Sequence, residues 1–138
     1  MTHFQNKLVA IMNRSTPPGV LMNALAHMTV GFGASIGREL LRLTNYKDKD
    51  GHDHPNISEI PFIILEANSN KIRGVREQAK EGGIQFVDFT HTMTEGSFEE
   101  QLARSLETHE KDLIYYGIVL FGEWEKVSAM TRKFSLWK

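Results

Sequence analysis

Apolar residues gather along the chain in short blocks separated by polar stretches. Continuous apolar runs occupy residues 8–12, 62–65 and 113–121, and an alternating run occupies residues 84–89. Continuous runs predict strands covered on both faces, whereas alternation predicts a strand with one covered face. The pattern therefore predicts four strands, which we number one to four in chain order.

Apolar residues at helical spacing follow the first run. Leu21, Leu25 and Met28 repeat at intervals of three or four after Pro17, a residue favoured in the first turn of a helix. Because glycines at residues 31 and 33 interrupt the pattern before it resumes, we expect a second helix or a kinked continuation to about residue 43.

Three further helices are expected between and after the later strands. Asn68 and its neighbours provide a cap for one helix, and Gly82 ends it. Ser97 with Glu100 three positions later is a capping box for the next. A short helix is expected at about residues 124–130, and strands alternating with helices in this way predict an α/β fold with helices on both faces of a sheet.

Composition narrows the class of protein. The 138 residues are 41% hydrophobic and 24% charged, which fits one globular domain spanning residues 1–138. The net charge of −1 provides no overall basic field, so nucleic acid is not an expected partner. Because there are no cysteines, disulfides, thiolate nucleophiles and zinc–thiolate sites are excluded.

Nothing in the pattern indicates export or a membrane. The first six residues are mostly polar, and the apolar run that follows is too short for a signal peptide. We expect no apolar stretch that approaches the length needed to span a bilayer. We therefore expect a cytoplasmic protein that does not enter a membrane.

Polar residues follow three of the predicted strands. In a parallel α/β sheet, ligands bind outside the carboxyl ends of the strands. We expect one cleft there, lined by Asn13, Ser15, His27, Asp88 and Thr92, with Arg14 near its rim and Asn68 close by. Asp88, Thr92 and His27 are the candidate catalytic groups, since a carboxylate, a hydroxyl and an imidazole can polarise water. The alternative is that these residues only cap helices and form turns.

Residues 45–61 form the longest polar segment and are expected to be a loop, because Pro55 and Pro61 disfavour regular structure. His52 and His54, with Asp48 nearby, have the spacing of a metal site. A solvated loop explains the same residues, so no required metal and no cofactor is expected.

Three segments together resemble a known family: NRSTPPGVLMNALAHMTVG at 13–31, DGHDHPNISEIPFIIL at 50–65, and YYGIVLFGE with TRKFSLWK from 115 to the end. The chain resembles an uncharacterised bacterial family of unknown function that is similar to a divergent branch of the type II peptidyl-tRNA hydrolases. This resemblance implies a three-layer α/β/α sandwich. Its four-stranded mixed sheet has the order 2-1-4-3, with the last strand antiparallel.

The hydrolase motifs are only partly present. Gly19 and His27 match the glycine and histidine of the motif G-K-x-A-A-Q-x-x-H, but Val20 stands at its lysine and Ala24 at its glutamine. In the motif D-A-G-x-T, Asp88 and Thr92 match, while Thr90 replaces the glycine. Valine can neither bind phosphate nor orient an ester, so the resemblance implies the fold rather than the reaction.

Three functions remain open. The first is a small-molecule or anion-binding protein on the hydrolase-like scaffold, in which Asn13, Arg14, Ser15, Gly19 and Asn68 hold the ligand. The second is a hydrolase or transferase of changed specificity, and the third is an interaction module. A homodimer is also expected, because Trp124, Phe134 and Trp137 place large apolar groups near the chain end. The competing arrangement folds Trp137 back over the sheet.

Overall fold

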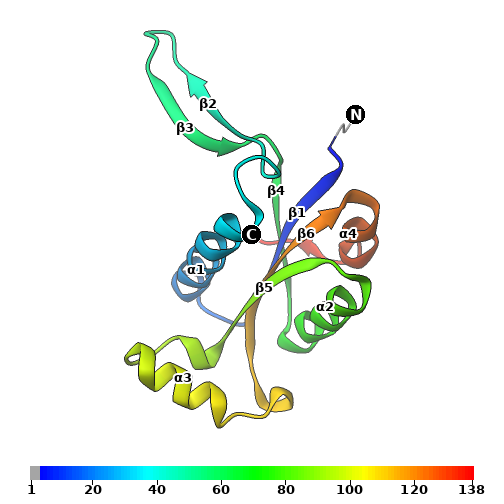
Figure 1. Cartoon of the computed structure of the whole chain (residues 1–138). Coiled ribbons are helices and arrows are strands. Elements are labelled where there is room, and N and C mark those ends of the chain that lie inside the picture. Colours follow the sequence, from blue (N-terminus) through cyan, green and yellow to red (C-terminus); the bar gives the residue numbers. More distant parts are fainter. Residues whose placement is uncertain (1–3) are drawn as a thin grey trace.

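The computed structural model describes residues 4–138 (Figure 1). The first three residues of the polar amino-terminal stretch lie outside the described residues. The elements are β1 (Asn6–Asn13), α1 (Pro18–Ile36), β2 (Leu43–Lys47), β3 (Asp53–Ser58), β4 (Phe62–Ala67), α2 (Ser69–Gly82), β5 (Gln85–Thr90), α3 (Phe98–Leu106), β6 (Tyr115–Glu123), α4 (Trp124–Thr131) and β7 (Ser135–Leu136). Two 3-10 turns, at His91–Met93 and Glu110–Asp112, join the later elements.

The main sheet is mixed and has the order β5-β6-β1-β4-β7. β1 pairs in parallel with β4, while β6 is antiparallel to both of its neighbours, β1 and β5. The carboxyl ends of β1, β4 and β5 therefore open on one edge of the sheet. The expected relative order of the four long strands is confirmed. The expected count of four is wrong, because β7 pairs with β4 and adds a fifth strand.

Helices cover both faces of the sheet (Figure 1). Alternate residues of β1 point to opposite sides: Ala10 and Met12 pack with the α1 residues Leu21 and Met28, whereas Val9 and Ile11 pack with α2 and α4. Both layers exclude water, because these side chains are almost fully buried. β1 therefore lies at the centre of two separate apolar layers. Burial of apolar surface contributes about 25 cal/mol per Å² to the stability of each layer.

The first helix is longer and more apolar than expected. α1 runs unbroken through Gly31 and Gly33 to Ile36 and ends where Gly37 takes a positive φ of 91°. An 18-residue window of α1 has a mean hydropathy of 1.3, so by length and composition it is a candidate membrane span, and the expectation that no such stretch exists is wrong. Its inner side packs on the sheet, as the covering helix of a globular domain does.

The polar segment after α1 forms a β-hairpin rather than a loop. β2 and β3 pair antiparallel and project away from the main sheet (Figure 1). Pro55 fits within β3 because the register shifts there: Pro55 and Asn56 lie opposite Asn45, and Asn56 has a φ of 63°. A bulge leaves a residue unpaired, so the missing N–H of proline costs no ladder hydrogen bond.

The capping box at the start of α3 is confirmed. The Ser97 hydroxyl accepts from the Glu100 backbone N–H at 3.2 Å, and the Glu100 carboxylate accepts from the Ser97 N–H at 2.9 Å. The reciprocal bonds satisfy two backbone donors that a helix start otherwise leaves free.

Candidate functional site

The ends of β1 and β4 meet at the edge that the sequence indicated. The Arg14 backbone N–H donates to the carbonyl oxygen of Ala67, the last residue of β4, at 3.0 Å, which continues the pairing one residue past the end of β1. Asn13 is 4% exposed: its Nδ2 donates to the Tyr115 carbonyl at 2.9 Å, and its Oδ1 accepts from the Ser15 N–H at 2.9 Å. One buried amide thus ties β1 to the start of β6 and shapes the turn that follows.

The start of α2 is docked against the same place. Asn68 caps the helix through its Oδ1, which accepts from the Lys71 N–H at 2.9 Å. The Ser69 hydroxyl oxygen accepts from the Tyr115 N–H at 2.9 Å. The first backbone N–H groups of α2 therefore lie at this sheet edge, where they create a partial positive charge.

These elements enclose a hollow of about 510 Å³, which we call the strand-end cleft. Its lining comes from three separate parts of the chain: the end of β1, the N-cap and first turns of α2, and the segment that leads into β6. The lining residues are Asn13, Ser15, Asn68, Ser69, Asn70, Arg73 and residues 111–114. Apart from the last two of these, Leu113 and Ile114, every lining residue has a polar or charged side chain.

An ion-pair network forms one wall of the cleft. The Arg73 Nε donates to Glu110 Oε2 at 3.0 Å, its Nη2 donates to the Leu113 carbonyl at 2.6 Å, and the guanidinium lies 5.2 Å from the centre of the Tyr115 ring. The Tyr115 hydroxyl donates to Glu110 Oε2 at 2.7 Å. This hydrogen bond and Arg73 lower the pKa of Glu110. Burial and the same hydrogen bond raise the pKa of Tyr115 far above its usual value.

Asp88 lies outside the cleft. It faces α2, where its Oδ2 accepts from Arg76 Nε at 2.9 Å and its side chain is only 16% exposed. Its neighbour Phe89 points to the opposite side of the sheet and packs in the α1 layer. A carboxylate that ends a buried strand needs a partner, and Arg76 supplies it.

The other two candidate catalytic residues also lie elsewhere. His27 is exposed on α1 and stacks on Phe89 with 5.9 Å between ring centres, so it lies on the opposite face of the sheet from Asp88. Thr92 is fully buried, and its Oγ1 accepts from the Ser105 hydroxyl at 2.8 Å and lies 2.7 Å from the Thr90 hydroxyl. The expectation of one cleft shared by Asp88, Thr92 and His27 is therefore wrong, because Asp88 faces α2, Thr92 is buried in the turn after β5, and His27 lies on the α1 side of the sheet.

Of the remaining expected ligand-binding residues, Asn13, Ser15 and Asn68 are brought together in the strand-end cleft. Arg14 and Gly19 are exposed next to it but do not line it. Sequence reasoning missed Arg73 and the segment 111–114. The antiparallel direction of the last long strand was the available signal, because it brings the start of that strand to the edge where β1 and β4 end.

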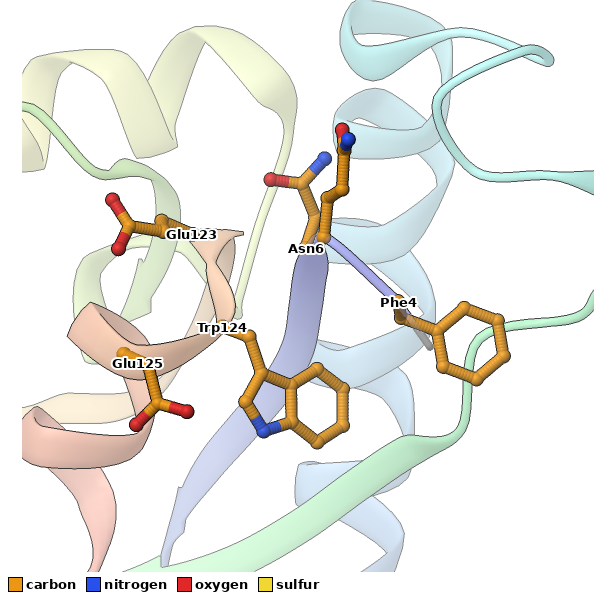
Figure 2. A pocket seen from close by; sticks show the side chains of 6 residues that line it. Phe4, Asn6, Glu123, Trp124 and Glu125 are labelled. Carbon is orange, nitrogen blue, oxygen red and sulfur yellow. The ribbon is translucent and has the colours of Figure 1, made fainter. Parts of the chain in front are cut away.

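A second hollow, of about 610 Å³, lies at the opposite edge of the sheet (Figure 2). Figure 2 shows the Glu123 and Glu125 carboxylates on one side of Trp124, with Phe4 and Asn6 on the other. Lys7 Nζ lies 4.9 Å from the centre of the Trp124 ring and donates to the Ser128 hydroxyl at 2.9 Å. Only two chain segments form this hollow, so fewer independent groups converge here than in the strand-end cleft.

The hairpin histidines make local contacts. His54 Nε2 lies 2.9 Å and His52 Nδ1 3.6 Å from Asp48 Oδ2, and all three side chains are exposed. The hydrogen bond from His54 lowers the pKa of Asp48. Within residues 4–138, no group of three or more histidine, cysteine, aspartate or glutamate side chains is arranged to hold a metal ion. That no metal is required at His52 and His54 stays a prediction.

Comparison with known proteins identifies relatives but no activity. The chain is similar to a protein of unknown function from Agrobacterium tumefaciens, Atu0240, with 17% identity and a TM-score of 0.83 over 98% of this chain and 99% of that one. This likeness shows a shared fold. No curated protein matches the chain. The profile of the family described as "Protein of unknown function (DUF2000)" matches residues 6–138, so the chain belongs to the DUF2000 family.

Proposed function

We propose that this protein binds a small anionic molecule, carrying a carboxylate or a phosphate, in the strand-end cleft. The observation that carries the proposal is the convergence of polar side chains from three chain segments on one hollow of about 510 Å³. A pocket of a few hundred cubic ångströms with a few converging polar groups is the usual form of a small-molecule site.

The preference for an anion comes from the α2 side of the cleft. The N–H groups of the first turn of α2 open there, and Arg73 and Lys111 add positive charge. Arg73 is already paired with Glu110, so Lys111 is the cation with the freer charge. Asp112 is also in the lining and repels an anion from its own side, which directs the charged end of the ligand toward Ser69 and Asn70.

Binding is favoured over catalysis because the candidate catalytic groups are engaged elsewhere. A nucleophile and its base must lie within about 3 Å of each other. Asp88 is paired with Arg76, Thr92 is sealed in a hydroxyl cluster, and His27 is on the other face of the sheet. No contact in the structure favours a hydrolase or transferase that uses these three residues.

The scaffold itself is proposed to be similar to that of the type II peptidyl-tRNA hydrolases, without their reaction. Support comes from the order β4-β1-β6-β5 with an antiparallel β6, which matches the order implied by the resemblance. Val20, at the lysine position of the motif, is exposed near the start of α1. We expect purified protein to release tRNA from peptidyl-tRNA more slowly than about 1 per second, and a faster rate in that assay would contradict this expectation.

Titration of the protein with inorganic phosphate and with succinate at low ionic strength tests the binding proposal. We expect saturable binding, with amide NMR shifts centred on Ser69 and Asn70. Lys111→Gln removes a charge from the lining and is expected to weaken binding about 3- to 10-fold. Lys80→Gln, in the last turn of α2 and outside the cleft, is the matched control and should bind like the wild type.

Three results would reject the proposal. They are no saturable binding of either probe, shifts centred away from the cleft, and equal effects of the Lys111 and Lys80 variants. The last outcome would indicate binding to the general charge of the protein rather than to a site.

A further inference from the structure

A smaller cavity, of about 180 Å³, lies on the α1 side of the sheet at the root of the β2–β3 hairpin and is distinct from both hollows described above. We call it the hairpin-root cavity. It is walled by the last turns of α1, by the sheet, and by the first and last residues of the hairpin. None of its lining residues belongs to the strand-end cleft, so it is a separate feature of the molecule.

The walls of the hairpin-root cavity are mostly apolar and buried, and the exposed side chains of Asn56 and Phe62 lie at its open side. Leu8, Phe32, Ile36, Leu41 and Val119 line it, and each is at most 9% exposed. None of its lining residues is charged. A charged ligand would lose its hydration here without gaining a partner, so the cavity excludes ions.

The polar side chains in the lining have hydrogen bonds within the protein. The Thr29 hydroxyl donates to the Leu25 carbonyl at 2.9 Å. The Ser58 hydroxyl donates to the Leu41 carbonyl at 2.6 Å and accepts from the Ile60 N–H at 3.1 Å. A ligand therefore gains little from polar groups of its own, and its binding depends on filling apolar space.

Gly33 opens the cavity on the helix side. A Cβ placed on Gly33 meets only the Leu41 Cδ1, at 3.9 Å, which is ordinary contact distance. A larger residue at this position would extend into the cavity. Glycine in the middle of a helix lowers the stability of the helix by roughly 0.5–1 kcal/mol relative to alanine. At residue 33 the missing side chain leaves space that belongs to the cavity.

We propose that the hairpin-root cavity binds a small uncharged apolar molecule, the size of one aromatic ring or a branched aliphatic group. The size follows from the volume: an apolar cavity of about 150 Å³ in another protein holds benzene. A volume of about 180 Å³ fits a molecule between toluene and indole in size. For so few atoms, a Kd between about 10 µM and 1 mM is expected.

Toluene and indole serve as probes, and benzoate serves as the charged counterpart of toluene. Binding is measured by ligand-observed NMR and by the rise in Tm that a ligand of the folded state produces. The wild type should bind toluene and indole saturably and should not bind benzoate.

Two matched pairs of variants locate the site. Gly33→Leu should fill the cavity and weaken toluene binding at least 10-fold, whereas Gly31→Leu, two residues away on the exposed side of α1, should not. Gly33→Ala fits without displacing Leu41, so it keeps the test valid if Gly33→Leu fails to fold. Gly33→Ala should weaken the binding of indole more than the binding of toluene, because indole is the larger molecule. Gly31→Ala has the same gain in helix propensity and should leave both affinities unchanged.

The proposal is overturned if neither toluene nor indole binds the wild type, if benzoate binds as well as toluene, or if the variants at Gly33 and Gly31 behave alike. None of these outcomes depends on the strand-end cleft, so this inference and the proposed function can fail separately.

Discussion

The two helical layers that cover the sheet differ in charge. α1 has no aspartate, glutamate, lysine or arginine among its 19 residues, whereas the 14 residues of α2 include Lys71, Arg73, Arg76, Glu77, Lys80 and Glu81. The α2 layer is fastened by ion pairs to Asp88 and Glu110, and the α1 layer is held by apolar packing. Both layers have apolar cores, but charged side chains surround only the α2 core, and each of the two proposed ligands matches the side of the sheet that holds it.

Buried apolar side chains are expected to contribute equally to the free energy of unfolding in both layers. Met28 in α1 and Ile72 in α2 are each at most 2% exposed, and each packs against the sheet. Met28→Ala and Ile72→Ala should each lower the free energy of unfolding by about 2–5 kcal/mol. Urea denaturation followed by circular dichroism checks this. A loss confined to one variant would show that one layer contributes little to the cooperative unit.

Removing an ion pair should affect only the α2 layer. Asp88→Asn leaves the partly buried Arg76 with only the longer ion pair to Glu77, at 3.4 Å, and is expected to cost about 1–3 kcal/mol in unfolding free energy. A double-mutant cycle with Arg76→Met, measured in urea, gives the coupling between the two side chains. Phosphate binding in the strand-end cleft should be unchanged by Asp88→Asn. Loss of binding would indicate that Asp88 contributes to the binding site.

The apolar outer face of α1 is where we expect the predicted homodimer to form. Trp137 packs against the α1-side core, as in the competing arrangement in which it folds back over the sheet, so we place the predicted interface elsewhere. Met22 and Val30 on α1 are 65% and 76% exposed. Val30→Lys should weaken dimerisation tenfold or more, about 1.4 kcal/mol, in light scattering.

Leu106→Lys on α3 is the matched control for the dimer, since Leu106 is 88% exposed on another helix. It should leave the dimer intact. A monomer mass for the wild type at micromolar concentration would end the homodimer prediction, and equal dissociation by both variants would move the interface away from α1.

The smallest expected effect is on the free energy of unfolding at acidic pH. The folded protein depresses the pKa of Glu110 below 4.5 through the Tyr115 hydroxyl and Arg73. A depressed carboxyl pKa stabilises the fold above the unfolded value, and this stabilisation is lost as pH falls through the folded value. Glu110→Gln should therefore flatten the loss of stability below about pH 4.5 in urea titrations. An unchanged acid profile would show that the network contributes nothing measurable.

The sequence predicts the sheet better than the site. Continuous apolar runs predicted β1, β4 and β6, because a strand buried on both faces has few alternatives, and an alternating run predicted β5. The hairpin was missed because its strands are almost wholly exposed and Pro55 occupies a bulge. The catalytic grouping failed for a different reason: proximity at a strand end does not say which face a side chain takes. Asp88 and Phe89 are neighbours in the chain and belong to opposite layers.

The central position of β1 has a consequence for synthesis. β1 ends at Asn13, yet its neighbour β6 ends at Glu123, about 110 residues later in the chain. At roughly 5–20 residues per second, the nascent β1 waits about 5–20 s for that partner. Its other neighbour, β4, ends at Ala67 and is complete earlier. The β6 side of β1 therefore has no strand partner until β6 has been synthesised.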